Sequence, residues 1–384
     1  MSTRALIVGG GIGGLTAAVA LRQRGVDATV FERATDLSHI QVGTGIHLWP
    51  NATRALQQIG LADAVTAVGA EVEQARFLNW KNKPLTVLDV GGPGRRLGAP
   101  TVGILRGEVH RALAGALGTD AIRLGAECAG VEQDADGVTL RLADGSGERG
   151  ELLIGADGLH STVRAQVRGS ESPRYASLSW LGLVDFEARE DAPGDALNVI
   201  WGPGKGFIFF HVGGSKLSWI GNVVGTEDME LPPLGARKDA VLSEYEGWTE
   251  PVGSILAATE ETQITPMRIF DRKPTEHWGH GRVTLLGDAA HPLIPTITQG
   301  ACQAIEDGIT LAKCVASNDD TVAALQSYER ARIARTAPLQ KTARRLARIE
   351  TWKSPMSCAL RDQIFKRFSW EISKQDEKIF EHEV

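Results

Sequence analysis

The glycine-rich turn near the N-terminus constrains the fold more than any other part of the sequence. The six residues GGGIGG at 9–14 lie between a short, wholly apolar run at 5–8 and a segment with a helical pattern. In a strand–turn–helix unit of this spacing, Gly9 makes the tight turn, Gly11 lets the backbone approach a pyrophosphate, and Gly14 allows close packing of helix on strand. The free N–H groups at the helix N-terminus then attract phosphate. We expect five residues of the turn to contact a dinucleotide: Gly9, Gly11, Ile12, Gly13 and Gly14.

A second apolar run, 28–31, follows the helical segment and ends at an acidic residue, Glu32. In dinucleotide-binding units an acidic residue about twenty residues beyond the glycines accepts a hydrogen bond from a ribose hydroxyl, and Glu32 fits that role. The next residue, Arg33, either faces the adenosine end or lies on the surface. Two strands joined through a helix build a parallel sheet, and we expect further buried strands at 152–154 and 283–286.

The pattern changes in the middle of the chain. Strand-like segments at 179–186, 207–212 and 217–224 are separated by glycine and proline turns, which favours an antiparallel sheet. Residues after about 321 have the pattern of long charged helices, and the basic stretch 330–348 is expected to form a solvated helix face. The chain therefore leaves a nucleotide-binding fold, builds a β-rich domain and returns.

Charge and composition exclude several classes of function. The net charge of −6 argues against a nucleic-acid partner, and no apolar run reaches the length of a membrane span. The four cysteines form no CxxC pair, so we expect reduced thiols and a cytoplasmic protein. His277 and His280 have no third ligand at a suitable spacing, so we expect no metal site.

Two later segments resemble fingerprints of one enzyme family. Segment 153–164, LIGADGLHSTVR, resembles the "DG" fingerprint of flavoprotein aromatic hydroxylases. Segment 285–292, LLGDAAHP, continuing through Gln299 and Gly300, resembles their "GD" fingerprint. With the glycine turn, three fingerprints occur in the family's order. The chain thus resembles the single-component FAD-dependent aromatic hydroxylases of the p-hydroxybenzoate hydroxylase type, most of all the salicylate and 6-hydroxynicotinate hydroxylase-like members.

This resemblance implies an α/β fold in which a Rossmann-like FAD-binding domain is interleaved with a β-sheet substrate domain and followed by C-terminal helices. The FAD-binding domain is expected to be discontinuous, with the segments 1–72, 98–174 and 275–330. The β-rich substrate-binding domain is expected at 73–97 and 175–274, and the C-terminal helical segment at 331–384.

The resemblance also implies roles for residues around FAD. Asp288 is expected to hold the ribityl chain as a charged acceptor, and Arg106 resembles an arginine that contacts the cofactor. Gln299 should open a helix whose N–H groups and dipole stabilise negative charge at the flavin ring, although the family usually has Gly where this chain has Thr298. Asp157 either serves FAD and the nicotinamide or caps a turn. The other residues expected at the cofactor are Gly287, Pro295, Gly300 and Ala301.

Two histidines are candidates for the catalytic site. His47 lies in a segment that resembles the family's active-site segment, where a histidine can act as general base on a hydroxyaromatic substrate; it could also contact the flavin or pack in the loop. His211 shares one face of its strand with Phe207 and Phe209, and either points into the substrate pocket or belongs to the core.

The implied activity is a monooxygenase that hydroxylates a small aromatic or heteroaromatic molecule through a C4a-hydroperoxyflavin. FAD is the expected cofactor, and NADH or NADPH a transient co-substrate with O2, because the sequence has a single dinucleotide-binding turn. A flavin epoxidase or double-bond reductase of the same fold remains an alternative, as does a non-enzymatic sensor of flavin or aromatic ligands. The protein is expected to be a monomer or homodimer.

Overall fold

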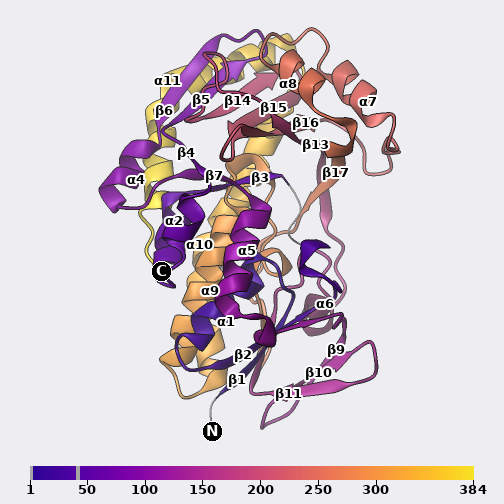
Figure 1. Ribbon diagram of the computed structural model, residues 1–384, viewed down its shortest axis with the longest axis vertical. Coiled ribbons are helices and arrows are strands. Elements are labelled where there is room, and N and C mark those ends of the chain that lie inside the picture. Colours follow the sequence, from indigo (N-terminus) through magenta and orange to yellow (C-terminus); the bar gives the residue numbers. More distant parts are fainter. Residues whose placement is uncertain (1–2, 40–43) are drawn as a thin grey trace.

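The computed structural model describes residues 3–39 and 44–384. Its elements form two regions (Figure 1): the N-terminal strands and the helices that cover them at one end, and a larger sheet at the other. Among the described residues, no helix is long and apolar enough to cross a membrane.

A five-stranded parallel sheet forms the first region. Its order is β18-β12-β1-β2-β8, and every pair is parallel. The predicted strands at 5–8, 28–31, 152–154 and 283–286 are confirmed to within one or two residues. The sheet's strands are β1 (Arg4–Val8), β2 (Asp27–Glu32), β8 (Ile122–Leu124), β12 (Leu152–Gly155) and β18 (Val283–Leu285).

Helices cover this sheet, and two of them approach each other unusually closely. α1 (Ile12–Arg22) packs along α9 (Gly300–Ala316). A Cβ added at Gly308 of α9 would lie 2.7 Å from the backbone N of Ala17, so glycine is needed for this approach. The other long helices of this region are α5 (Arg106–Leu117) and α10 (Thr321–Glu350).

A seven-stranded sheet, ordered β17-β13-β16-β15-β14-β5-β6, forms the second region. Its neighbours are antiparallel except for the parallel pair β14–β5, which confirms the expected antiparallel character. Its strands are β5 (Gln74–Asn79), β6 (Pro84–Asp89), β13 (Arg174–Asp185), β14 (Ala196–Gly202), β15 (Lys205–His211), β16 (Lys216–Val223) and β17 (Ile264–Asp271). They come from both segments expected to build the substrate domain, whereas the exact domain boundaries stay a prediction.

A small sheet joins the two regions. It consists of β3 (Gly45–Leu48), β7 (Val102–Leu105) and β4 (Ala70–Glu71) in the order β3-β7-β4. A Cβ added at Gly45 would lie 2.5 Å from the side chain of Val212, and one added at Gly103 would lie 2.3 Å from the carbonyl oxygen of His211. These two glycines let β3 and β7 lie directly against the large sheet, which fixes where the side chains of β3 point.

The remaining elements are peripheral to the two main sheets. β9 (Cys128–Gln133), β10 (Val138–Leu142) and β11 (Gly147–Gly150) form an antiparallel sheet beside the first region. The long helix α11 (Pro355–Phe380) runs beside β6 (Figure 1), so α10 and α11 confirm the expected C-terminal helices. The shorter helices are α2 (Pro50–Gln57), α3 (Ala62–Thr66), α4 (Gly91–Leu97), α6 (Thr162–Arg168), α7 (Arg237–Glu244) and α8 (Val252–Ala258).

Candidate active site

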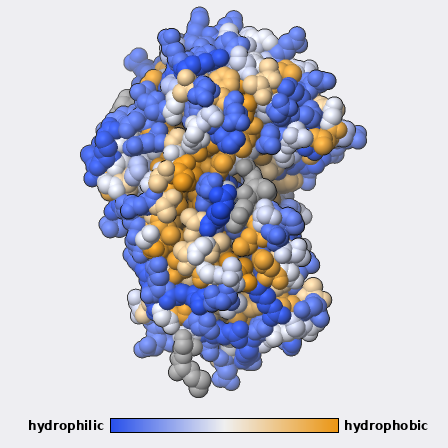
Figure 2. Space-filling view, in the orientation of Figure 1, coloured by the Kyte–Doolittle hydropathy of each residue, from blue (hydrophilic) through white to orange (hydrophobic). Residues whose placement is uncertain are grey.

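A cavity of about 330 Å³ lies where the two regions meet. Figure 2 shows hydrophobic surface gathered across the middle of one face, between two largely hydrophilic ends. The residues around the cavity come from the glycine turn, from β3, from the large sheet and from the start of α9. Among the predicted site residues, those that line it are Gly11, Ile12, Gly13, His47, Arg106, Gly287, Asp288, Pro295, Gly300 and Ala301.

The glycine turn has the geometry that its spacing predicts. Gly9 has φ +108°, and a Cβ there would lie 2.4 Å from the carbonyl oxygen of Ala156. A Cβ at Gly14 would lie 2.1 Å from the carbonyl oxygen of Gly9, so Gly14 permits helix α1 to approach its strand. Gly11 differs from both, because no atom lies within 4 Å of an added Cβ and the residue faces the cavity. Gly9 and Gly14 therefore shape the turn, while Gly11 leaves room for a ligand.

Glu32 and Arg33 follow at the end of β2, outside the cavity lining. The carboxylate of Glu32 accepts hydrogen bonds from the backbone N–H groups of Gly10 (2.7 Å) and Ala34 (2.8 Å), so it holds the turn in place. Each carboxylate oxygen retains a lone pair for a ribose hydroxyl. The side chain of Arg33 is exposed, which fits the surface alternative for this residue.

Arg106 and Asp288 bring opposite charges into the cavity. Arg106 is the first residue of α5, and Asp288 lies in the short turn Gly287–Ala289 that follows β18. Asp288 lines the cavity and is solvent-exposed; desolvation by the surrounding protein raises the pKa of its carboxyl, while His291 and Arg106 oppose the shift. Burial lowers the pKa of Arg106, and Asp288 opposes it. The pair presents one acceptor and one donor to a polar ligand chain.

The N-terminus of α9 opens onto the same cavity. Gly300 and Ala301 line it, and no side chain caps the helix. Gln299 turns the other way: its Oε1 accepts hydrogen bonds from Asn51 (3.1 Å) and Gln303 (3.0 Å) below the helix. Gln299 therefore contributes the start of the helix rather than its side chain, and the uncapped end leaves backbone N–H groups for an anionic or electron-rich ligand.

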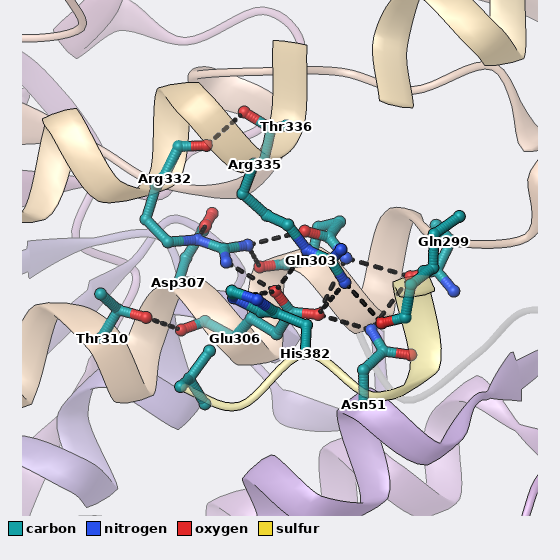
Figure 3. A network of polar contacts seen from close by, with 12 residues as sticks. Asn51, Gln299, Gln303, Glu306, Asp307, Thr310, Arg332, Arg335, Thr336 and His382 are labelled. Atoms are coloured by element: carbon teal, nitrogen blue, oxygen red, sulfur yellow. Dashed lines mark hydrogen bonds and ion pairs between the residues drawn. The ribbon is translucent and has the colours of Figure 1, made fainter. Parts of the chain in front are cut away.

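A buried network of charges lies beneath this helix end (Figure 3). Arg332 of α10 donates to Glu306 at 2.5 Å and to Asp307 at 2.6 Å, and each of these side chains is at most 1% exposed. Arg335 also reaches Glu306, at 3.2 Å. Burial alone would raise the pKa of Asp307, but His291 and Arg332 lower it to about 2. Two carboxylates and two guanidinium groups thus balance each other and hold α9 against α10.

The cationic half of this network was not predicted from the sequence. No role was predicted for Glu306 or Asp307, and the stretch 330–348 was expected to form a solvated helix face. That expectation is wrong for Arg332, which is 1% exposed. The three-residue spacing of Arg332 and Arg335 places both on one side of α10, and this is the signal that could have indicated buried partners.

Thr298 stands in the cavity wall just before α9, where the family usually has glycine. Its φ of 49° and ψ of 30° are left-handed, which costs a β-branched residue roughly 1–2 kcal/mol. Its hydroxyl accepts a hydrogen bond of 2.8 Å from the indole N–H of Trp49. The path of the loop is thus the one a glycine would favour, and the contact with Trp49 offsets part of the strain.

His47 lies in β3 and faces the cavity. The residue is 1% exposed, and neither ring nitrogen has a hydrogen-bond partner among the described residues. Its ring packs on Phe210 with centroids 3.8 Å apart, and on Trp49 at 5.6 Å. Burial lowers the pKa of His47 to about 3, so the imidazole is neutral near pH 7. A buried ring with two unpaired nitrogens is unusual, and almost no surface of either nitrogen is open to the cavity.

His211 lies on the other side of the large sheet from the cavity. Phe210 lines the cavity, so its neighbour His211 points to the opposite face of β15. There Phe207 and Phe209 pack in a core of their own, and the ring of His211 is engaged by the backbone of Ala192. Strand alternation was correct, but the face that meets the cavity is that of Phe210, and His211 is a core histidine.

Asp157 also lies outside the cavity lining. Its carboxylate accepts hydrogen bonds from the hydroxyl of Ser161 (2.5 Å) and the backbone N–H of Val163 (3.2 Å) at the start of α6. Burial raises the pKa of Asp157, and these hydrogen bonds oppose the shift. The side chain thus acts at the helix N-terminus, which is the capping alternative of the sequence analysis, while its neighbours Ala156 and Gly158 line the cavity.

Comparisons with known proteins agree with this arrangement. The family model described as "FAD binding domain" matches residues 2–343. The chain is 37% identical over 365 residues to aurachin C monooxygenase/isomerase of Stigmatella aurantiaca, covering 95% of this chain and 94% of that protein. It is also 37% identical over 365 residues to 3-amino-4-hydroxybenzoate 2-monooxygenase of Streptomyces cremeus, covering 94% and 91%.

A solved structure extends the agreement to three dimensions. HpxO of Klebsiella pneumoniae, complexed with FAD and uric acid, superposes with a TM-score of 0.91 at 30% identity, covering 98% of this chain and 96% of that one. The likeness spans both sheets and the C-terminal helices, and it confirms the α/β fold with an added β-sheet domain. The chain therefore belongs to the FAD binding domain family, and it is an FAD-dependent monooxygenase of the aromatic hydroxylase type.

Proposed function

We propose that this enzyme hydroxylates a small aromatic or heteroaromatic molecule in the part of the cavity beside His47, at the expense of NADH or NADPH and O2. The observation that carries the proposal is the continuity of the cavity. Its lining runs from the phosphate-binding turn at Gly11, past Asp288 and the start of α9, to an apolar wall that contains His47. Relatives add support: two are named for aurachin C and for 3-amino-4-hydroxybenzoate, and the HpxO structure is a complex with uric acid.

The described residues fit FAD. Neither α1 nor α9 has a side-chain cap, and both helices begin at the cavity. The first would hold the pyrophosphate and the second the flavin ring, with Asp288 and Arg106 between them. When bound, FAD supplies the redox chemistry, and the protein supplies binding, orientation and a dry site. Glu32 would accept a ribose hydroxyl at the far end.

His47 is proposed to accept the proton of the substrate's hydroxyl. Its neutral ring offers one acceptor nitrogen and one N–H donor. Because burial lowers the pKa of His47 to about 3, the ring takes a proton poorly on its own. Negative charge that develops on an adjacent substrate oxygen raises the pKa of the imidazole, since an opposite charge favours the protonated form. The proton transfer is thus coupled to the reaction of the substrate.

Three further properties complete the proposal. The nicotinamide nucleotide visits transiently, because the chain has one glycine turn at a strand–helix junction and FAD occupies it. The protein works in the cytoplasm as a monomer or homodimer. The division into an FAD-binding domain at 1–72, 98–174 and 275–330 and a substrate domain at 73–97 and 175–274 follows the two sheets.

The test is turnover by the purified FAD-bound protein. Phenols, aromatic acids and heteroaromatics are screened for stimulated NAD(P)H oxidation and oxygen consumption, and products are analysed by mass spectrometry for one added oxygen atom. The proposal expects at least one ligand that gives all three signals, and the His47→Gln variant should lower kcat with that ligand while FAD is retained. Reduction of a double bond without oxygen uptake, or no stimulation by any ligand, would contradict it.

A further inference from the structure

Trp49 links the two halves of the cavity. The cofactor half is lined by the glycine turn, by Arg106 and Asp288, and by the start of α9. We call the part beside the large sheet the substrate half and define it by six residues that line it: Ile46, His47, Phe210, Ile220, Leu293 and Pro295. Trp49 directly follows β3, which carries His47, and its indole N–H donates to the hydroxyl of Thr298 (2.8 Å) just before α9. One side chain thus connects a wall of the substrate half to the loop that opens α9.

Two other rings stack on the indole of Trp49. The ring of His47 lies 5.6 Å from it, with the two planes inclined by 26°. The ring of Phe380, the last residue of α11, lies closer, with centroids 4.9 Å apart and planes inclined by 13°. Trp49 is 6% exposed and Phe380 is 3% exposed. Loss of the Phe380 ring would open a space beside the indole, because close-packed neighbours relax only partly into a cavity.

The chain on either side of Phe380 is anchored to neighbouring helices. Arg335 of α10 donates a hydrogen bond of 2.7 Å to the carbonyl oxygen of Ile379. Arg54 of α2 pairs with Glu383 at 3.3 Å, and His382 lies beside the buried network under α9 (Figure 3). Because α2 begins directly after Trp49, the same helix holds the indole and the segment that carries Phe380. The position of the Phe380 ring against Trp49 is therefore fixed from both sides.

We infer that Phe380 is a positioning residue for FAD: its ring fixes Trp49, and the indole N–H of Trp49 fixes Thr298 and hence the backbone N–H groups at the start of α9. Phe380 does not line the cavity, so it acts on the cofactor through Trp49. The N–H groups at the helix start stabilise negative charge, which reduced flavin carries. A displaced helix start should therefore weaken the binding of reduced FAD more than that of oxidised FAD. The inference rests on the proposed position of the flavin ring at α9 and does not depend on the identity of the substrate.

A matched pair of variants separates positioning from general stability. Phe365 is the control for Phe380, because it also lies on α11, is 6% exposed and packs on a tryptophan, Trp201, with centroids 4.2 Å apart. Phe380→Leu and Phe365→Leu should both lower the midpoint of urea unfolding. Only Phe380→Leu should lower the midpoint potential of bound FAD, by about 30 mV, which corresponds to a ten-fold larger loss of affinity for reduced than for oxidised FAD. Equal shifts of the potential in the two variants, or none in Phe380→Leu, would overturn the inference.

A double-mutant cycle tests whether the effect passes through Trp49. Trp49→Phe keeps a ring beside Phe380 but removes the indole N–H, so it should lower the potential of bound FAD by a similar amount. Adding Phe380→Leu to Trp49→Phe should then shift the potential little further, although stability falls again, because residues that act in series are not additive. Additive shifts would refute the route through Trp49. No shift in Trp49→Phe would also refute it, whereas the proposed hydroxylation would stand, since the turnover screen tests that separately.

Discussion

The two halves of the cavity are lined by different parts of the chain, mainly backbone in one and side chains in the other. Around the glycine turn and the start of α9, the protein presents backbone: glycines without side chains and two helix ends without caps. In the substrate half it presents side chains from separate strands, among them His47, Phe210 and Ile220. The first half recognises a ligand common to a whole family, and backbone geometry suits that task because it does not change with side-chain substitution.

The two halves of the cavity also differ in the interactions that hold them in place. The start of α9 rests on buried ion pairs between Glu306, Asp307 and Arg332, which lock one helix against another. His47 packs against the rings of Phe210 and Trp49, and neither of its nitrogens has a hydrogen-bond partner among the described residues. The cofactor half is therefore held by buried ion pairs, whereas the substrate half is held by the packing of rings.

The largest effect should follow from breaking the support of the cofactor half. Arg332→Leu leaves Glu306 and Asp307 buried without their main partner, so we expect the free energy of unfolding to fall by about 3–5 kcal/mol. FAD affinity should fall with it, because the start of α9 loses its anchor. Urea unfolding and FAD titration measure both quantities.

Arg330→Leu is the matched control, since Arg330 lies on the same helix but is exposed, and among the described residues its side chain hydrogen-bonds to Ser327. We expect a change of about 0.5 kcal/mol or less. Similar losses in the two variants would show that the buried network does not stabilise α9.

Local spacing made most of the cofactor half predictable from the sequence. The turn at 9–14 lies directly between a strand and a helix that are adjacent in the sequence. The roles of Gly9, Gly11 and Gly14 could therefore be predicted from local spacing. Gly287 and Asp288 became recognisable through a fingerprint of adjacent residues. The network was harder, because Arg332 meets Glu306 across 26 residues and only the helical spacing of its arginines indicated a shared face.

The side chains that line the substrate half are determined by packing between distant segments, which no local sequence pattern predicts. Alternation in β15 placed Phe210 and His211 on opposite faces, but it could not tell which face meets the cavity. That choice depends on how β3 and β7 press against the large sheet through Gly45 and Gly103. Likewise, the residues 92–94, GPG, have the composition of a turn but lie in α4 (Gly91–Leu97); proline is tolerated in the first turn of a helix.

A pH titration tests whether the substrate half is as dry as its lining indicates. The pKa of His47 is lowered from 6.5 to about 3 in the folded protein, so the unfolded chain binds one more proton between these values. Stability should therefore rise with pH across this window. His47 should contribute about 2 kcal/mol of that rise between about pH 5 and about pH 7.

Urea unfolding of flavin-free wild-type protein and of His47→Gln at several pH values isolates this contribution, because all other titrating groups cancel in the difference. At about pH 7 the stabilities of the two proteins should differ only through the change in packing. As the pH falls below 7, the stability of His47→Gln should decrease less steeply than that of the wild type. Parallel curves for the two proteins would mean that water reaches the ring and that the pKa is near its ordinary value.

Gly11 and Gly14 sharpen the distinction between shaping the turn and leaving room for the cofactor. A Cβ added at Gly11 would meet no atom within 4 Å, and Gly11 lines the cavity. Gly11→Ala should therefore leave the free energy of unfolding unchanged. It should weaken FAD binding about ten-fold, or about 1.4 kcal/mol. Gly14→Ala should instead destabilise the fold, since its Cβ would lie 2.1 Å from the carbonyl oxygen of Gly9. Tight FAD binding by Gly11→Ala would place the pyrophosphate elsewhere.

The smallest effect concerns Thr298, which joins the two halves. Its left-handed backbone belongs to the loop that opens α9, and its hydroxyl accepts the N–H of Trp49, whose ring lies against His47. Thr298→Val keeps the strain and removes the acceptor, so a nearly buried indole N–H loses its partner and stability should fall by about 1 kcal/mol.

Thr298→Gly removes the strain and the acceptor together. Because the gain of roughly 1 kcal/mol from a relaxed left-handed residue offsets the lost hydrogen bond, its stability should stay close to that of the wild type. Thermal unfolding with excess FAD measures both variants, and Thr298→Ser serves as the control that keeps the acceptor. If valine and glycine destabilise equally, the hydroxyl contributes through the hydrogen bond alone, and the left-handed conformation of Thr298 is not strained.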